Sequence, residues 1–454
     1  MFLQQRALHF TGIGGIGMSG LAEIYHALGC PVSGSDVKLS VITQRLETLG
    51  IRITEGHSAS NMPAEAAAVV VTSAVRDDNP ELVEAHRRGL PVVLRGELLA
   101  ELMRHRRGVA FGGSHGKTTS SSMAACVALA ASLDPTVFIG TLAPFLGGSN
   151  ARLGGDLLIT ECDESDGSFL ELAPFLSVIT NIDREHLDYY KTFENVQNAF
   201  VRFANKVAWY GAAIVCIDNP QVRSLLPRMR RRLIRYGQST DADLRIHDAR
   251  CDNAGSTFRL ARGAEELGEF QLHVLGTHNV LNATAVIAAM LELDVPLEKI
   301  RAGLAQYRGT GRRMEIKGSA AGVTVIDDYG HHPTEVRATL AALRLMQPKR
   351  LVVLFQPHRF TRTQLLMDEF AGSFGDADVV RVMEIYAASE PPLEGVTASA
   401  LVERIRAAGH ADCALAGAAD ELKLELRPGD LVLTLGAGSV TQMGPRLLDE
   451  LRKG

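Results

Sequence analysis

The sequence is poor in aromatic side chains, which make up 6% of its 454 residues and include a single Trp. So few aromatic rings give no sign of a surface that stacks the bases of single-stranded nucleic acid. Basic charge is not in excess either, because 47 Lys and Arg face 52 Asp and Glu, for a formal net charge of −5. Without a basic field, neither nucleic acid nor an anionic membrane is an expected partner.

Long apolar runs are also missing, and none approaches the ~18 residues that indicate a membrane span. The N-terminal sequence MFLQQRALHF lacks the charged start and long apolar stretch of a signal peptide. The six cysteines are scattered with no CxxC pair, at Cys30, Cys126, Cys162, Cys216, Cys251 and Cys413. This spacing favours packed thiols over disulfides or zinc, and we expect a cytoplasmic protein.

Apolar residues are plentiful at 46%, and the length predicts about three domains at ~150 residues each. Short apolar runs alternate with amphipathic helical stretches, which is typical of α/β layers. We place the domains at 1–107, 108–309 and 310–454, with the second boundary in a Gly-rich basic segment. The basic run Arg228–Arg235 (RMRRRLIR) is interpreted as a solvated helix face, because no aromatic residue interleaves it.

A first glycine-rich loop, Gly12–Gly17, has the pattern GxGxxG between a predicted strand and a predicted helix. Such glycines let the backbone approach a diphosphate, and the following helix presents free N–H groups to the anion. Asp36 ends the next predicted strand, where a ribose hydroxyl is often bound. The loop predicts a nucleotide site without saying which nucleotide, and an NAD(P)-dependent oxidoreductase is one alternative.

A second loop, GSHGKTT at 113–119, follows the predicted strand GVAFG. Its backbone N–H groups can cradle phosphates, the Lys117 ammonium can neutralise β/γ oxygens, and the Thr118 hydroxyl can hold Mg²⁺. The loop departs from GxxxxGK[ST], because Phe111 stands at the first Gly position. It nevertheless predicts an ATP site.

Acidic and histidine residues follow two later strands of the same region. The strand DLLIT ends in an acidic segment, and we favour Glu161 as a Mg²⁺ ligand because it lies closest to the strand. The other carboxylates of that segment fit a solvated loop. After the strand LSVITN, His186 either completes a metal shell or is a hydrogen-bonded loop residue.

Downstream, the candidates are amides and arginines. Asn279 and Asn282 share one face of a predicted helix, although isolated amides on a helix usually face solvent. Arg312 and Arg313 either clamp phosphate or are linker charge. The segments 327–332 and 356–362 follow predicted strands, where an Arg can hold a substrate carboxylate with its bidentate fork.

Together these motifs resemble those of the Mur ligase family. HFTGIGGIGMSG, GSHGKTT, ECDESDGSF, GTGRRME, DDYGHHPTE and FQPHRFTRT occur in this order across nearly the whole chain. The last two are the most specific, and Ser114 stands where the family commonly has Thr. The resemblance implies an α/β fold of three domains. These are an N-terminal Rossmann-like domain that binds a UDP-sugar, a central P-loop ATPase domain, and a C-terminal Rossmann-like domain that binds an amino acid.

The activity that the resemblance implies is ATP- and Mg²⁺-dependent joining of L-alanine to the lactyl carboxylate of UDP-N-acetylmuramate through an acyl phosphate. The nearest rival within the family attaches a preformed murein tripeptide to the same sugar. The segments DDYGHHPTE and PHRFTRT favour the single amino acid. A monomer or a homodimer is expected.

The resemblance also implies a role for individual residues. For ATP these are Gly113, Ser114, His115, Gly116, Lys117, Thr118, Thr119, Asn279, Asn282, Arg313 and Asp328. For the UDP-sugar they are Gly12, Gly14, Gly15, Gly17, Ser35, Asp36 and Ser73. The amino acid would be bound by Tyr329, His331, Arg359 and Arg362. The metal would be held by Thr118, Glu161 and His186. Lys117, Arg313 and His331 would be catalytic, with His331 as the candidate base.

Overall fold

The structure, a computed structural model, describes residues 6–453, so the first five residues of the N-terminal sequence discussed above lie outside it. The chain divides into two compact units. The first contains Met1–His247, Arg259–Phe270 and Leu281–Tyr307, and the second contains Asp248–Phe258, Gln271–Val280 and Arg308–Gly454. Among the described residues, no helix combines the length and apolar character that crossing a membrane requires. The six cysteines, all described, form no disulfide.

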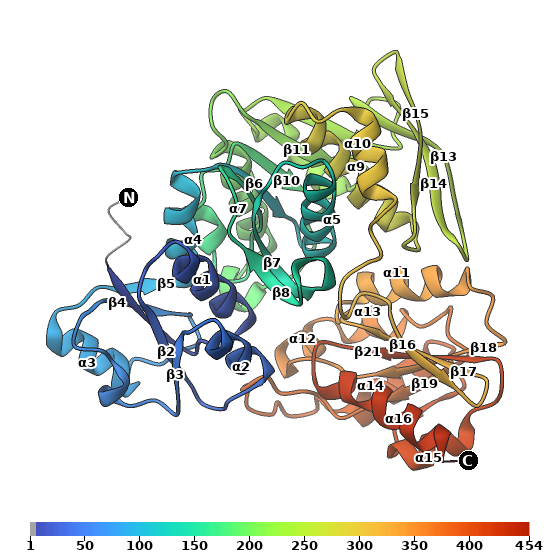
Figure 1. The fold of residues 1–454 in the computed structure, drawn as a ribbon. Helices are drawn as coiled ribbons and strands as arrows, with labels where there is room; N and C mark the ends of the chain where they lie inside the picture. Colours follow the sequence, from blue (N-terminus) through green and yellow to red (C-terminus); the bar gives the residue numbers. More distant parts are fainter. Residues whose placement is uncertain (1–5, 454) are drawn as a thin grey trace. The chain divides into compact units, whose positions relative to one another are not determined.

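The first sheet is parallel and has the strand order β3-β2-β1-β4-β5 (Figure 1). Its strands are β1 Ala7–Thr11, β2 Val32–Asp36, β3 Arg52–Glu55, β4 Ala66–Val71 and β5 Val92–Leu94. Its helices are α1 Ile16–Ala27, α2 Val41–Thr48, η1 Ala59–Asn61, α3 Pro80–Arg88 and α4 Arg95–Arg104. Helices α1 and α3 cover opposite faces. Leu8 and Phe10 belong to the core under α1, so the alternation of a strand turns His9 and Thr11 toward the face of α3.

The second sheet has ten strands in the order β15-β14-β13-β12-β11-β10-β6-β9-β7-β8. Its strands are β6 Arg107–Gly112, β7 Thr136–Ala143, β8 Ser149–Arg152, β9 Leu157–Glu161, β10 Leu176–Ile179, β11 Ala212–Cys216, β12 Leu233–Gly237, β13 Leu244–Asp252, β14 Gly255–Arg262 and β15 Glu265–Leu272. Its helices are α5 Lys117–Ala130, η2 Pro144–Leu146, η3 Ser168–Glu171, α6 Leu187–Tyr190, α7 Phe193–Asn205, α8 Pro220–Leu225, η4 Leu226–Arg228, α9 Thr277–Glu292 and α10 Leu297–Leu304. Because β6 pairs in parallel with β9 and β10, the loops after these three strands meet at one edge.

The prediction of a solvated helix face at Arg228–Arg235 is wrong. Arg228 ends the short helix η4, and the chain then enters β12 at Leu233. Ile234 and Tyr236 are buried in the sheet, while the Arg235 guanidinium pairs with Asp243. The run therefore follows the two-residue period of a strand, which its density of positive charge conceals in the sequence.

Helix α1 of the first sheet is fastened to the β7–β8 hairpin of the second. Asn150 Nδ2 donates to the carbonyl oxygens of Ile16, at 2.7 Å, and of Ile139, at 3.1 Å. Ser149 Oγ donates to Glu23 Oε2 at 2.6 Å, and the same carboxylate accepts hydrogen bonds from both terminal nitrogens of Arg45. A Cβ on Gly20 would lie 2.6 Å from Asn150 Nδ2, so α1 and the hairpin touch directly.

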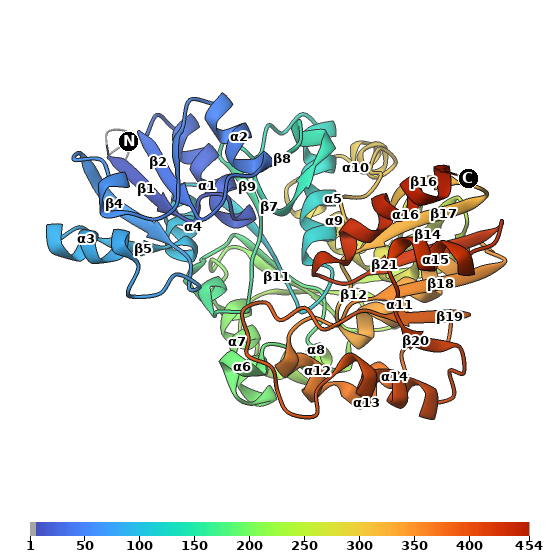
Figure 2. The same ribbon diagram turned by 90° about the horizontal axis from the view of Figure 1, so that it is seen from below.

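The third sheet lies in the second unit and has the order β16-β17-β21-β18-β19-β20, parallel except for the β16–β17 pair. Its strands are β16 Glu315–Ala320, β17 Val323–Asp328, β18 Arg350–Phe355, β19 Val379–Val382, β20 Cys413–Leu415 and β21 Asp430–Leu435. Its helices are α11 Pro333–Arg344, α12 Phe360–Leu365, α13 Met367–Ala371, α14 Ala398–Ala407, α15 Ala419–Glu425, η5 Ser439–Gln442 and α16 Met443–Arg452. Helices α13 and α14 cover one face, and α15 and α16 cover the other (Figure 2). The α/β fold class is confirmed.

Candidate functional site

The second glycine-rich loop joins the buried strand β6 to helix α5, as the sequence predicts. Gly113 has a φ of 125°, and a Cβ there would lie 2.1 Å from Thr180 Oγ1. Gly116 has a φ of 84° and would place a Cβ 2.6 Å from Asn282 Oδ1. Only glycine fits at either position, and the close approach puts the Asn282 amide directly against the loop.

The Lys117 ammonium folds back over its own loop. Its Nζ donates to the carbonyl oxygens of Gly113, at 2.7 Å, and of Ser114, at 3.1 Å, and to Glu164 Oε1 at 2.9 Å. Burial opposes the charge, but Glu164 and Asp163 outweigh it and raise the pKa of Lys117 above its ordinary value. The loop therefore carries a fixed positive charge at the start of α5, suited to phosphate oxygens.

Two carboxylates and an imidazole gather beside this lysine. The ligand atoms of Glu164, Glu185 and His186 all lie within 4.8 Å of one another. His186 has a φ of 56°, and its Nε2 is 3.6 Å from Glu164 Oε1 and 3.9 Å from Glu185 Oε2. Glu164 Oε2 is buried and accepts no hydrogen bond from the described residues. Such an oxygen-rich set fits a divalent cation of the Mg²⁺ type.

Glu161, the carboxylate favoured from the sequence, ends β9 apart from that group of three. Its Oε2 accepts a hydrogen bond from the Gly140 N–H at 3.0 Å, and a Cβ on Gly140 would lie 2.5 Å from it. Its assignment as a metal ligand stays a prediction, as does that of Thr118, which lies in the first turn of α5. Sequence reasoning named Glu164 only as part of an acidic run and missed Glu185.

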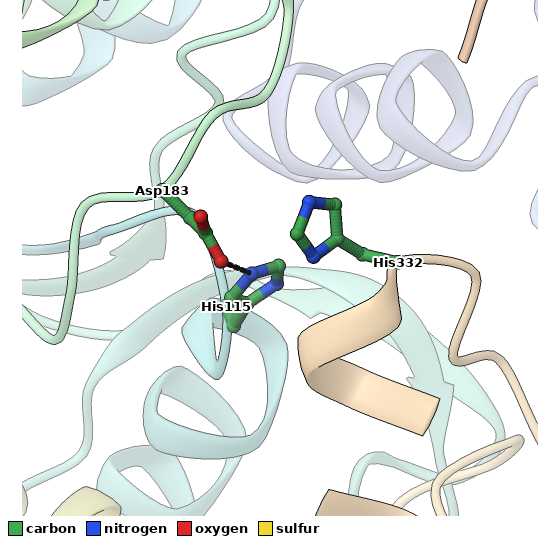
Figure 3. Close-up of side chains that lie close together, drawn as sticks. All are labelled: His115, Asp183 and His332. Atoms are coloured by element: carbon green, nitrogen blue, oxygen red, sulfur yellow. Dashed lines mark hydrogen bonds and ion pairs between the residues drawn. The ribbon is translucent and has the colours of Figure 1, made fainter. Parts of the chain in front are cut away.

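The segment after β10 clamps the same loop. His115 Nε2 donates a hydrogen bond to Asp183 Oδ2 at 3.1 Å, drawn as a dashed line in Figure 3. The His115 N–H donates to Asn181 Oδ1 at 2.8 Å, and Ser114 Oγ accepts from the Asp183 N–H at 2.9 Å. Asn181 and Asp183 were not assigned a role from the sequence, although they follow a strand adjacent to β6. His332, also labelled in Figure 3, belongs to the second unit, where it caps α11.

The first glycine-rich loop follows β1, and Asp36 closes it. Gly12 has a φ of 78°, and the Gly14 N–H donates to Asp36 Oδ2 at 2.8 Å. A Cβ on Gly17 would lie 2.9 Å from the Arg95 side chain, which sequence reasoning missed. Gly15 caps α1, and Ser35 and Ser73 lie at the ends of β2 and β4. These residues line the carboxyl edge of the sheet, where α/β sheets bind ligands.

In the second unit, Tyr329 lies beneath two guanidinium groups. The central carbons of Arg312 and Arg313 are 4.8 Å and 5.1 Å from its ring centroid. Asp328 accepts hydrogen bonds from the N–H groups of Met314 and Gly330, both at 2.8 Å, and burial raises its pKa. Asp328 therefore anchors the segment that carries both arginines.

His331 and His358 lie together above the carboxyl edge of the third sheet. His331 Nδ1 donates to the carbonyl oxygen of Tyr329 at 3.0 Å, so in the neutral ring Nε2 carries the lone pair. Its ring centroid is 5.8 Å from that of His358, which stacks on Tyr386. Burial and the neighbouring His331 and Arg362 lower the pKa of His358 to about 3, so this ring is neutral and accepts from Arg362. The roles of His358 and Tyr386 were not foreseen.

Arg359 begins α12 with a φ of 69°, and its N–H donates to the Tyr386 carbonyl oxygen at 2.8 Å. Its Nη1 lies 3.9 Å from Glu390 Oε1, so a carboxylate already lies near this guanidinium. Asn279 and Asn282, on α9, are 4% and 5% exposed. The alternative of solvent-facing amides is therefore wrong, because α9 packs this face inward.

Three family models match the chain in succession. They are "Mur ligase family, catalytic domain" over residues 7–107, "Mur ligase middle domain" over 112–290, and "Mur ligase, glutamate ligase domain" over 312–438. The UDP-N-acetylmuramate--L-alanine ligase of Solibacter usitatus (strain Ellin6076) is 55% identical over 457 residues, which span 100% of this chain and 97% of that protein.

Solved structures agree with these matches. The UDP-N-acetylmuramate-alanine ligase of Thermotoga maritima is similar with a TM-score of 0.83 at 29% identity, covering 98% of this chain and 99% of that one. A murein peptide ligase from Psychrobacter arcticus shares the fold, with a TM-score of 0.73 at 23% identity and 99% of each chain covered. With two nucleotide-type loops, each at the end of a strand that pairs in parallel with its neighbours, and matches along its whole length, this chain belongs to the Mur ligase family.

Proposed function

We propose that the chain is an ATP-dependent carboxylate–amine ligase that joins L-alanine to the lactyl carboxylate of UDP-N-acetylmuramate. The observation that carries the proposal is the Lys117 loop with its adjoining carboxylates, in a chain 55% identical to a ligase of that name. Joining a carboxylate to an amine in water is unfavourable, so the carboxylate must first be activated. Phosphoryl transfer from ATP gives an acyl phosphate, which the amine attacks with loss of phosphate.

The central residues bind and neutralise phosphate. Lys117 offsets the charge of β/γ oxygens, and Arg313 is assigned to the same task from the C-terminal domain. Thr118, Glu161 and His186 would hold Mg²⁺, with Glu164 and Glu185 beside them. A bound Mg²⁺ would supply further neutralisation of the phosphate oxygens during transfer. Ser114 and His115 shape the loop, and Asn282 lies against it on the side assigned to the nucleoside.

The outer domains bind the two substrates that are joined, the UDP-sugar and the amino acid. Residues 1–107 hold the UDP-sugar on the Gly12–Gly17 loop, and residues 310–454 hold the amino acid. Arg359 and Arg362 are the carboxylate-binding candidates, because a guanidinium fork matches a carboxylate. His331 is the candidate base, since its Nε2 lone pair can take a proton from the attacking amine.

A phosphate-release assay tests the proposal. The full chain is incubated with ATP, Mg²⁺, UDP-N-acetylmuramate and, in turn, L-alanine, glycine and L-serine. We expect phosphate release only when UDP-N-acetylmuramate and an amino acid are both present, and the fastest phosphate release with L-alanine. Release that requires no amino acid would refute a ligase.

The second candidate is attachment of a preformed tripeptide to the same sugar. It is favoured only by the fold shared with a murein peptide ligase. Competition between L-alanine and L-alanyl-γ-D-glutamyl-meso-diaminopimelate separates the two, and we expect product from L-alanine alone.

A further inference from the structure

A carboxylate is completely buried in the first domain, beneath the strand ends that lead into the Gly12–Gly17 loop. Glu81 is the second residue of α3, and its side chain is 0% exposed. A buried Glu persists only when hydrogen bonds replace its lost hydration. Oε2 accepts from Thr11 Oγ1 and from Ser35 Oγ, both at 2.7 Å, and Oε1 accepts from Asn61 Nδ2 at 2.9 Å.

These partners keep Glu81 ionised. Burial opposes the negative charge, but hydrogen bonds from His9, Thr11, Asn61 and Ser35 outweigh it and lower the pKa of Glu81 to about 2. At neutral pH the carboxylate is therefore an acceptor only. Each hydroxyl that contacts it has to point its single proton toward it.

This requirement fixes the direction of the next hydrogen bond. Ser35 Oγ lies 2.7 Å from Glu81 Oε2 and 2.8 Å from His57 Nδ1. Because the one proton of Ser35 is committed to Glu81, Ser35 can only accept from His57. Nδ1 of His57 must then carry a hydrogen, and in the neutral ring the lone pair belongs to Nε2.

His57 is positioned to use that lone pair on a ligand. It follows β3 at the carboxyl edge of the sheet, beside the end of β2 that carries Ser35 and Asp36. Its side chain is 19% exposed, and its Nε2 makes no hydrogen bond with any residue in the described range. An imidazole held at one nitrogen and open at the other is an oriented acceptor.

We propose that Glu81 is a positioning residue that acts through Ser35 to hold His57 in the Nδ1–H form, so that Nε2 accepts the imide N–H of a uracil base. The inference rests on the proposed function, since it concerns the base of the same nucleotide sugar. Uracil carries a hydrogen on N3, whereas cytosine has a lone pair there. A cytosine would face His57 with lone pair against lone pair, and the network thus selects between the two bases.

The first test reads the proton position directly. Histidine labelled with ¹⁵N is introduced into the full chain, and long-range ¹H–¹⁵N spectra are recorded at pH 8. His57 is assigned by the signal lost in His57→Gln. We expect the Nδ1–H pattern for His57, with Nε2 shifted as a bare acceptor. An Nε2–H pattern would overturn the proposal, and this measurement needs no altered network.

The second test measures binding of UDP and CDP by calorimetry, without ATP or amino acid. We expect wild type to bind UDP at least ~10-fold more tightly than CDP, since one well-placed hydrogen bond is lost and two lone pairs meet. His57→Ala should reduce this preference to less than ~3-fold, and His57→Gln, which restores an acceptor near Nε2, should recover part of it.

Glu81→Gln should also reduce the preference, while the surface variant Glu84→Gln, which only loses pairs to Arg87 and Arg88, should keep it. Equal binding of UDP and CDP by wild type, or an unchanged preference in both His57→Ala and Glu81→Gln, would overturn the proposal. A chain that prefers UDP but releases no phosphate with UDP-N-acetylmuramate and L-alanine would instead refute the proposed function alone.

Discussion

The ammonium of Lys117 lies 2.9 Å from Oε1 of Glu164, whose carboxylate is 1% exposed. The lysine of the loop that is proposed to receive ATP is therefore paired with a buried carboxylate from the segment after β9. Loss of one partner from a buried pair strands the other charge, at a cost of ~3–5 kcal/mol.

Replacing Lys117 with Met should abolish catalysis and also weaken the fold. We expect phosphate release to fall by at least ~10²-fold, because the phosphate oxygens lose their nearest cation. The unfolding midpoint should fall as well, since Glu164 is left uncompensated. In the double variant Lys117→Met/Glu164→Gln, stability should recover while activity does not. Recovery of activity in the double variant would contradict the role of Lys117.

Adding a methyl group at Gly140 should disturb Glu161. The new Cβ would lie 2.5 Å from Glu161 Oε2, so this carboxylate must move. If Glu161 holds the metal, Gly140→Ala will require more Mg²⁺ for half-maximal activity, by about 10-fold for a ligand displaced by one side chain. Gly155→Ala is the matched control, because its Cβ would meet its nearest neighbour at an ordinary 3.5 Å. Equal Mg²⁺ dependence in both variants would remove Glu161 from the metal site.

Arg359→Ala should raise the KM for L-alanine and leave the KM for UDP-N-acetylmuramate unchanged. Loss of a charge-assisted hydrogen bond to a carboxylate is worth about 1.5–3 kcal/mol, which is roughly 10- to 100-fold in KM. Arg404→Ala, which breaks only an exposed pair with Asp368, should behave as wild type. If the KM for the UDP-sugar rises instead, Arg359 binds the UDP-sugar and not the amino acid.

Asp328→Asn should destabilise the second unit. Both carboxylate oxygens accept backbone N–H groups, so an amide nitrogen must face one of these donors. We expect a loss of about 1–3 kcal/mol, measured as a shift of the denaturant midpoint. Asp376→Asn is the control: Asp376 is exposed, so the same substitution there should leave the denaturant midpoint unchanged. An unshifted midpoint in Asp328→Asn would contradict the anchoring role.

Glu81 should make stability sensitive to acid. Its folded pKa of about 2 lies below its ordinary 4.5, so its contribution is present above pH 4.5 and is lost as the pH falls toward 2. The stability difference between wild type and Glu81→Gln should therefore be smaller at pH 3 than at pH 7 by ~2 kcal/mol. Urea unfolding at pH 7, 5, 4 and 3 measures it. A difference that is constant with pH would show that Glu81 is not ionised.

Loops at strand ends were the most predictable part of the site. The apolar runs before Gly113, Glu161 and Asn181 identify buried strands, and parallel neighbours bring their carboxyl ends to one edge. The choice among nearby carboxylates was not predictable in this way. Which of Glu161 and Glu164 faces Lys117 depends on how the loop turns after the strand, and the order of residues does not encode that direction.

The Glu81 network could not be found from motifs, because its members come from two strands, two helices and the loop after β3. One signal was present: the strands ALHFT and VSGSD alternate apolar and polar residues, which places His9, Thr11, Ser33 and Ser35 on one face. That pattern ordinarily indicates a face open to solvent. The covering helix α3 brings its own carboxylate, and only the tertiary structure shows it.

The bonds from Asn150 and Ser149 to helix α1 have a consequence for substrate length. They hold the helix that follows the Gly12–Gly17 loop at its first residue, Ile16, and further along at Glu23, and so fix the distance from that loop to the second sheet. If the loop binds the diphosphate of a UDP-sugar as proposed, the distance that the rest of the substrate must span to the second sheet is constant. We therefore expect a UDP-sugar with a shortened acid arm to react more slowly even where it binds as tightly.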